Sequence, residues 1–315
     1  MTKFLARRLL LGLITLWAIT VLVFAGTEIL PGDVASAVLG QSATEELKAA
    51  LRAQMGLDRP MLVRYFEWLG RLLSGDLGVS LVNSFPVDGI VGPRVLNTLY
   101  LATVTAVIAI PVSLALGLFS AAFPDSPFDR GVNVVTLFAV SVPDFLIAII
   151  LIIIFSVEMR WFPMMLKRVD FSDFGGAMHA LALPVATLML TMLSHMIRMT
   201  RATILDVLRS PYVEMAILKG ASKGRIILRH AAPNALAPIV NVVALNLGYL
   251  ISGVVVIEVI FTYPGLGRLM VDAIGTRDLP LVQITALIFC TTYIVLNIMA
   301  DMLAIMSNPR LRYST

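Results

Sequence analysis

The chain has 315 residues, of which 58% are hydrophobic and 14% charged, and its formal net charge is +4. With a mean hydropathy of +0.90, this composition excludes an ordinary soluble globular protein and indicates an integral membrane protein. The single cysteine, Cys290, excludes an intramolecular disulfide, and the three scattered histidines lack the neighbours of a metal site. No segment combines basic and aromatic residues as a nucleic-acid-binding face requires.

Six apolar runs are long enough to cross a bilayer as helices, since roughly 20 residues are needed for a hydrocarbon core about 30 Å thick. They are Leu9–Thr27, Thr98–Phe123, Asn133–Val157, Ala180–Met199, Leu236–Thr262 and Leu281–Met306. The alternating segments of a membrane β-barrel are absent from the sequence. Pro111, Pro143, Pro184 and Pro238 lie in or beside these runs, where each can kink a helix. We therefore expect an all-α integral membrane protein with six transmembrane helices.

The first run resembles a signal peptide in following Lys3, Arg7 and Arg8, but it is longer, and no small-x-small cleavage pattern closes it before Pro31. We therefore expect an uncleaved anchor with a cytoplasmic N-terminus. Alternating the spans from there places most cations of the short loops inside, as the positive-inside rule requires, and also makes the C-terminus cytoplasmic. The predicted inner cations are Arg130, Arg198, Arg201, Arg209, Lys219, Lys223, Arg225, Arg229, Arg310 and Arg312, and the outer ones are Arg160, Lys167, Arg168, Arg268 and Arg277.

A long segment, residues 28–97, separates the first two runs and carries two amphipathic helix patterns. The first has Ser42 or Thr44 as N-cap candidates and Gly56 as a stop. The second places a set of apolar residues on one side, namely Leu62, Tyr65, Phe66, Leu69 and Leu72. We expect a helical cap on the outer membrane surface; a sharper hypothesis is that this cap also docks an extracytoplasmic partner.

Motifs for catalysis are missing, because the sequence contains no HExxH, no GxSxG and no GxxxxGK[ST] phosphate loop. The chain is therefore predicted not to be an enzyme, and any energy that it uses must come from an ion gradient or from another chain. Three acidic residues lie in or beside the apolar runs, where a charged side chain at mid-helix costs about 2.5 to 3.5 kcal/mol. They are Asp144, Glu258 and Asp301. They are dispersed in depth, unlike a proton relay, and the last two have an alternative role as partners of Arg268 or Arg310.

A short basic segment, residues 210–240, interrupts the apolar sequence. Ser210 as N-cap and Pro211 at the first helical position predict a helix that Gly220 ends. Ser222 can cap a second short helix, Lys223–Ala231, before Pro233 and Pro238 redirect the chain. On the first helix one face carries Tyr212, Met215, Ala216 and Lys219. Because such a protrusion is too short and too cationic to cross a bilayer, we expect it to contact another protein.

The segment resembles the EAA loop of ABC-importer permeases, a Glu-Ala-Ala pattern with a glycine and a distal proline. Glu214, Ala216, Gly220 and Pro233 fit the spacing, whereas Met215 replaces the first alanine. The text "LRHAAPNAL" departs from the general pattern and is similar to the first permease subunit of dipeptide, oligopeptide and nickel importers. Further stretches agree with that branch: "GLDRPMLVRY", "SGDLGVSL", "SVPDF", "VIEVIFTYPGLGRLMVDAIGTRDLPLVQ" and "DMLAIMSNPRLRY".

This resemblance implies a type I importer permease of the bacterial plasma (inner) membrane that forms half of a pathway for peptides or peptide-like solutes. It implies as partners a homologous second permease, two cytoplasmic ATPases holding ATP and Mg²⁺, and an extracytoplasmic binding protein, with no cofactor on this chain. The implied solutes include dipeptides, longer peptides, glutathione, opines and nickel chelates. The implied ATPase-coupling residues are Tyr212, Glu214, Met215, Ala216, Lys219, Gly220 and Ser222, and the pathway candidates are Pro143, Asp144, Asn241 and Glu258.

The expected division of the chain follows the same resemblance. It has an N-terminal end with helix 1 (1–27), an extracytoplasmic segment (28–97), a core permease domain (98–306) with the coupling loop 210–233, and a cytoplasmic tail (307–315). Two alternatives stay open at this point. One is an ion-coupled secondary carrier, and the other is a membrane-anchored scaffold without transport.

Overall fold

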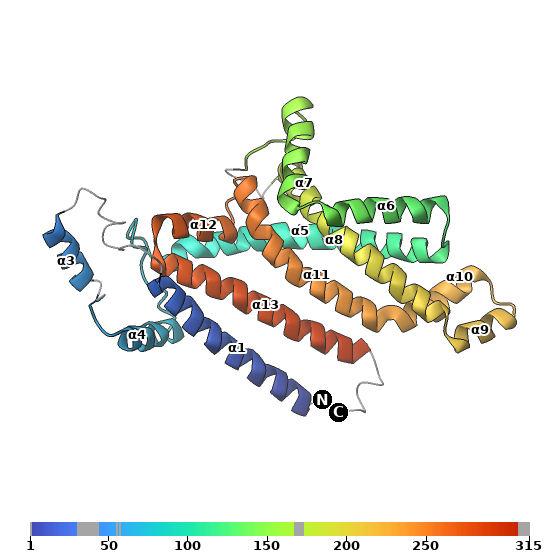
Figure 1. The fold of residues 1–315 in the computed structure, drawn as a ribbon, viewed down its shortest axis with the longest axis horizontal. Helices are drawn as coiled ribbons and strands as arrows, with labels where there is room; N and C mark the ends of the chain where they lie inside the picture. The colour runs from blue at the N-terminus through green and yellow to red at the C-terminus, as the bar shows by residue number, and fades with distance from the viewer. Residues whose placement is uncertain (1, 30–43, 55, 57, 167–172, 308–315) are drawn as a thin grey trace. The chain divides into compact units, whose positions relative to one another are not determined.

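A computed structural model of the protein describes residues 2–29, 44–54, 56, 58–166 and 173–307 (Figure 1). Five helices of this described part are long and apolar enough to cross a membrane, or six if one bent pair counts as a single span. The five are α1 Thr2–Ile29, α5 Val87–Ala122, α8 Phe174–Leu208, α11 Ala232–Ile260 and α13 Leu279–Ser307. The predicted all-α architecture is thus confirmed. The predictions on Pro31, Ser42, Lys167, Arg168, Arg310 and Arg312, and on the tail beyond residue 307, lie outside the described residues.

The third apolar run, Asn133–Val157, is not one straight helix but is sharply bent at Pro143, one of the positions where the sequence predicted that a helix could kink. Helix α6 (Pro127–Ser141) ends before Val142, which is extended at φ −100° and ψ 127°. A second helix begins at Asp144, bent by 106° from α6, and consists of α7 (Asp144–Leu151) followed by the π-helical η1 (Ile152–Glu158). Pro143 supplies the reason, because proline lacks an N–H and forces the preceding residue out of the helical region.

The other three prolines do not break their helices. Pro111, Pro184 and Pro238 lie inside α5, α8 and α11, which run through them. Each helix also extends beyond its apolar run, most clearly α5, which begins at Val87 rather than near Thr98. The apolar runs therefore locate these helices but place their first residues too late in the chain.

The described parts of Met1–Leu9, Leu99–Tyr263 and Val295–Thr315 form one compact unit. Within it α8 packs against α6, α7 and α11 (Figure 1). Gly117 on α5 faces α8 so closely that a Cβ there would lie 2.8 Å from the Thr200 Cβ and 3.0 Å from the Ile197 carbonyl oxygen. Only glycine permits this approach of the two helices.

A buried carboxylate fixes α6 within this unit. Arg201 of α8 donates from Nε to Asp129 Oδ1 and from Nη2 to Asp129 Oδ2, both at 2.7 Å. The Ser120 hydroxyl at the end of α5 and the Asp125 backbone N–H donate to the same carboxylate. Asn133, one turn along α6, donates to Oδ1 at 3.0 Å. Because every donor comes from a different position, one side chain joins the ends of α5, α6 and α8.

The described parts of Leu10–Thr98 and Pro264–Ile294 form a second compact unit. It contains α3 (Glu45–Gln54), α4 (Met61–Leu73) and α12 (Leu266–Thr276). Thr44 occupies the N-cap position of α3, with its Oγ1 accepting from the Leu47 N–H at 3.4 Å. Gly56 follows that helix in the left-handed region, at φ +66°, as a stop residue should.

The apolar residues that the sequence placed on one side of α4 lie in two different environments. Tyr65 is buried against α1, where its hydroxyl lies 2.9 Å from Thr20 Oγ1 and its ring meets Phe24 edge-on at 5.5 Å. Leu62 and Phe66 are instead 72% and 66% exposed. The helix therefore has one packed face and one exposed apolar face, as a helix lying in a membrane interface has.

Candidate functional site

The predicted coupling segment forms a short helix, α9 (Pro211–Leu218), that begins and ends where the sequence indicates. Ser210 has the extended conformation of an N-cap residue, φ −75° and ψ 146°, with Pro211 directly after it. The Ser210 hydroxyl does not cap α9, however, because it donates to the Val207 carbonyl oxygen at the end of α8. Gly220 turns the chain at φ +77°, and its N–H donates to the Ile217 carbonyl oxygen at 2.9 Å.

The outer side of α9 is apolar and exposed. Val213 is fully buried and holds the helix to its unit, whereas Met215, Ile217 and Leu218 are 54%, 55% and 74% exposed. The other predicted coupling residues are exposed too, except Ala216, which is partly buried: Tyr212, Glu214, Lys219, Gly220 and Ser222. We call Tyr212, Glu214, Met215, Ile217, Leu218 and Lys219 the α9 surface. Ile217 and Leu218 were not among the predicted coupling residues, although they directly precede Lys219 in the same turn.

The second helix of the segment differs from the prediction. The chain passes from α10 (Lys223–Arg225) through the π-helical η2 (Ile226–Ala231) into α11 without a break. Ala232, at that junction, is helical at φ −57° and ψ −45°. Pro233 and Pro238 therefore do not redirect the chain. Pro233 directly follows the π-helical η2, and such a wide turn accommodates a proline without ending the helix.

Asp144, a pathway candidate, lies at the start of α7 beside Pro143, and its Oδ1 accepts from the Thr191 hydroxyl of α8 at 3.0 Å. A groove of about 240 Å³ opens next to it between α7, α8 and α11. The residues that line the groove are Asp144, Leu188, Thr191, Met192, His195, Asn246, Tyr249, Leu250, Ser252, Gly253 and Val256. Most of its polar side chains, from α8 and α11, were not predicted from the sequence. The sequence did contain a signal for them, because Thr191 and His195 are four residues apart and therefore lie on the same face of one helix.

The remaining pathway candidates do not join this groove. Asn241 is exposed on α11, whereas Asn246, little more than one turn away, is buried and lines the groove. Glu258 is completely buried near the end of α11, and its carbonyl oxygen accepts from the Tyr263 N–H at 2.8 Å. Burial raises the pKa of the Tyr263 phenol, and the neighbouring Glu258 carboxylate raises it further. Asp144, Asn241 and Glu258 therefore lie in three separate environments, and Pro143 is the chain neighbour of Asp144.

Asp301, the third acidic residue of the runs, pairs within the described residues with Arg8, at 3.1 Å from Nη1 to Oδ2. The partners predicted for Glu258 and Asp301 were Arg268 or Arg310, and Arg310 lies outside the described residues. The observed pair joins α13 to α1, so both ends of the chain contribute to one ion pair.

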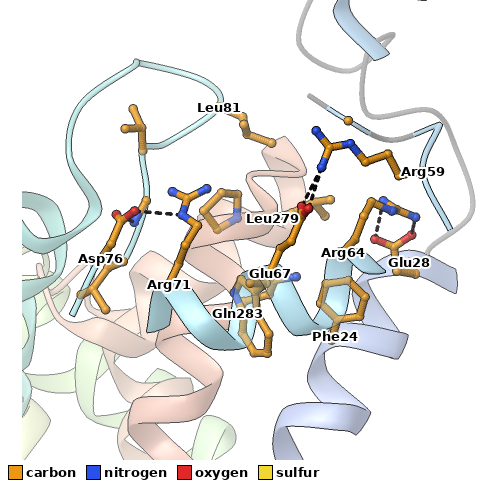
Figure 2. A pocket seen from close by; sticks show the side chains of 16 residues that line it. Phe24, Glu28, Arg59, Arg64, Glu67, Arg71, Asp76, Leu81, Leu279 and Gln283 are labelled. Atoms are coloured by element: carbon orange, nitrogen blue, oxygen red, sulfur yellow. Dashed lines mark hydrogen bonds and ion pairs between the residues drawn. The ribbon is translucent and has the colours of Figure 1, made fainter. Parts of the chain in front are cut away.

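The second unit has a larger pocket, about 550 Å³, beside α4 (Figure 2). Figure 2 shows three ion pairs in its wall, in which each arginine faces a carboxylate. They are Arg59 with Glu67, Arg64 with Glu28, and Arg71 with Asp76. The hydrogen bond from the Arg71 side chain holds the pKa of Asp76 below its usual value, and the Gly78 N–H lowers it further. This pocket is charged yet internally balanced, so it suits a polar partner better than lipid.

Comparison with known proteins places the whole chain among transport permeases. Residues 113–313 match the family described as binding-protein-dependent transport system inner membrane component, and residues 1–101 match the N-terminal part of such a membrane component. A Brucella abortus (strain 2308) protein whose assigned name is that of a peptide transport system permease is 38% identical over 314 residues, covering 99% of this chain and 100% of the relative. The glutathione transport system permease proteins GsiC of Salmonella typhi and Salmonella typhimurium are 35% identical over 305 residues, covering 96% of this chain and 97% of each relative.

Proposed function

The chain belongs to the family of binding-protein-dependent transport system inner membrane components, and we propose that it is one of two homologous permease subunits of an ATP-driven importer. It is an inner-membrane transport subunit and not an enzyme, as the sequence predicted, and its family binds no cofactor itself. Membership of a binding-protein-dependent system also removes the alternative of an ion-coupled secondary carrier. The names of the relatives support peptides, glutathione included, as the solute class.

We assign both chain ends to the cytoplasm, residues 28–97 to the extracytoplasmic side and residues 98–306 to the core permease domain. The excess of cations in the inner loops supports this orientation. Counting the bent pair α6 and α7 as one span makes six spans, the number that a type I importer permease has. ATP and Mg²⁺ belong to two partner ATPases, and the solute arrives from an extracytoplasmic binding protein.

The observation that carries the coupling role is the exposed apolar side of α9. Met215, Ile217 and Leu218 are more than half exposed on a helix that also bears Glu214 and Lys219. Exposed apolar side chains mixed with charges are typical of a protein interface, whereas a helix lying in lipid has a continuous apolar face. We assign the α9 surface to the ATPase contact.

The continuous helix after Gly220 explains how a movement of α9 reaches the spans. Val213 is buried, and α9 contacts both η2 and α8. Because η2 continues into α11 without a turn, a displacement of α9 is transmitted directly to α11. Closure of the two ATPases would therefore tilt α8 and α11 together, opening and closing the pathway by rigid-body motion.

A charge placed on the α9 surface tests this assignment. Leu218→Glu puts a carboxylate on a side chain that is 74% exposed, so the chain still folds but the apolar contact is lost. The expected result is that the ATPases no longer copurify with the permease and that ATP-driven uptake into proteoliposomes is abolished. Leu62→Glu is the matched control, because Leu62 is 72% exposed on α4 and receives the same change. Normal ATPase association in Leu218→Glu would contradict the assignment.

A further inference from the structure

The groove beside Asp144 contains a carboxylate that lacks a basic partner among the described residues. Two other carboxylates of the same unit are each paired with an arginine, Asp129 with Arg201 and Asp301 with Arg8. Asp144 has the Thr191 hydroxyl as its hydrogen-bond donor, and no described lysine or arginine forms an ion pair with it. Because an ionisable group in a membrane-spanning helix is costly to keep, such a residue points to a charged ligand.

The other groups in the groove also suit a cation. The Asn246 Nδ2 donates to the Val242 carbonyl oxygen of its own helix, which leaves the Oδ1 of this buried amide as an acceptor. The Tyr249 and His195 rings lie nearly parallel at the rim, with centroids 6.3 Å apart and planes at 11°. Tyr249 is 72% exposed, so the face of its ring is accessible, and aromatic faces attract cations.

A glycine keeps the space in front of the carboxylate open. A Cβ at Gly253 would lie 3.8 Å from Asp144 Oδ2 and 3.6 Å from Leu188 Cδ2. A methyl group there makes ordinary contacts, but a longer side chain would fill the groove against Oδ2. The groove therefore has a negative end, an accessible carboxylate oxygen and apolar walls from Leu188, Met192, Leu250 and Val256.

We propose that this groove binds the ammonium group of a peptide-like solute during its passage, with Asp144 as the counter-charge. The inference rests on the proposed function and assigns it a ligand subsite. A free peptide and glutathione share an α-ammonium group, so one subsite serves both. The bond needed is a charge-assisted hydrogen bond from the ammonium to Asp144 Oδ2, while Thr191 keeps Oδ1 in place.

The test uses the complete complex in proteoliposomes, with its binding protein and ATP. Two labelled solutes, dialanine and glutathione, are each compared with their N-acetyl derivatives, and the ratio of uptake is corrected for the affinity of the binding protein for each. The wild type is expected to favour the free amine. Asp144→Asn should lower uptake of the free-amine solute about tenfold and bring the ratio to about one.

Two further variants change the groove but keep the Asp144 carboxylate. A third variant, at a distant carboxylate, serves as the control. Thr191→Val removes the positioning hydroxyl and Gly253→Leu fills the groove, so both should reduce the ratio. Glu158→Gln alters an exposed carboxylate at the far end of the same bent segment and should leave the ratio unchanged.

The outcomes separate this subsite from the function itself. Three outcomes would overturn the subsite without contradicting the importer function. They are an unchanged uptake ratio in Asp144→Asn, a wild type that does not prefer the free amine, and an equal loss of uptake for free and acetylated solutes. If the wild-type complex imports none of the four solutes with ATP, the proposed function fails as well.

Discussion

Arg201 on α8 binds the carboxylate of Asp129 on α6 with two parallel hydrogen bonds, both 2.7 Å long. The Asp129 side chain is 2% exposed and that of Arg201 24%, so the pair is largely removed from solvent. Removing one partner of a buried pair leaves the other charge without compensation. The Asp129–Arg201 pair is therefore expected to contribute more to stability than the exposed ion pairs of the described residues.

Arg201→Ala is expected to destabilise the protein by about 3 kcal/mol, because the buried Asp129 would lose its main donor. Thermal unfolding of the solubilised complex measures the loss. Arg59→Ala breaks a pair in which both side chains are more than half exposed, and it should cost less than about 1 kcal/mol. Equal effects of the two substitutions would show that burial of the Asp129 pair is unimportant.

Gly117→Ala should separate α5 from α8. The added Cβ would lie 2.8 Å from the Thr200 Cβ, and repairing such an overlap costs about 1 to 3 kcal/mol. Gly131→Ala is the control, because a Cβ at that position of α6 meets nothing within 4 Å. Alanine there should be neutral or stabilising by up to about 1 kcal/mol. Chemical unfolding measures the free energy of unfolding of both variants, which should fall for Gly117→Ala and stay unchanged or rise for Gly131→Ala.

Gly220→Ala should strain the turn that ends α9. An L-residue at φ +77° costs about 1 to 2 kcal/mol, whereas Gly224, in the next helix, has no positive φ and open space around it. Amide hydrogen exchange should accelerate in α9 for Gly220→Ala and stay unchanged for Gly224→Ala. Faster exchange in both variants, or in neither, would show that the left-handed turn does not hold the helix.

Asp76 should give the second unit an acid-sensitive contribution to stability. Its folded pKa is lowered, chiefly by the Arg71 hydrogen bond, so this contribution is present above the unfolded pKa of about 3.9 and is lost as pH falls through the folded pKa. Denaturant unfolding from pH 7 to pH 3 should show a constant difference between wild type and Asp76→Asn above about pH 5, and a shrinking one below. The effect is small, since both side chains of the pair are exposed. A difference that grows on acidification would contradict the assigned direction.

Much of the architecture follows from local properties of the sequence. The length of an apolar run decides whether a helix can cross a bilayer, so five of the six runs correspond to continuous helices. The ends of α9 are equally local, because proline at the first position and glycine after the last turn act through their own backbones. The resemblance read from residues 210–240 and from the other quoted stretches is confirmed by the family matches.

Tertiary structure decided the features that depend on neighbours. The sequence indicated a kink at Pro143, but not that the chain would turn by 106°. The sequence also indicated that the chain changes direction at Pro233. In the structure the helix continues there, because the π-helical turn accommodates the proline. Asp144 was a candidate by itself, yet its groove needs Thr191 from α8 and Asn246 from α11. A hydropathy pattern records which residues avoid water, whereas the partner of a polar side chain within the membrane is set by which helices pack together.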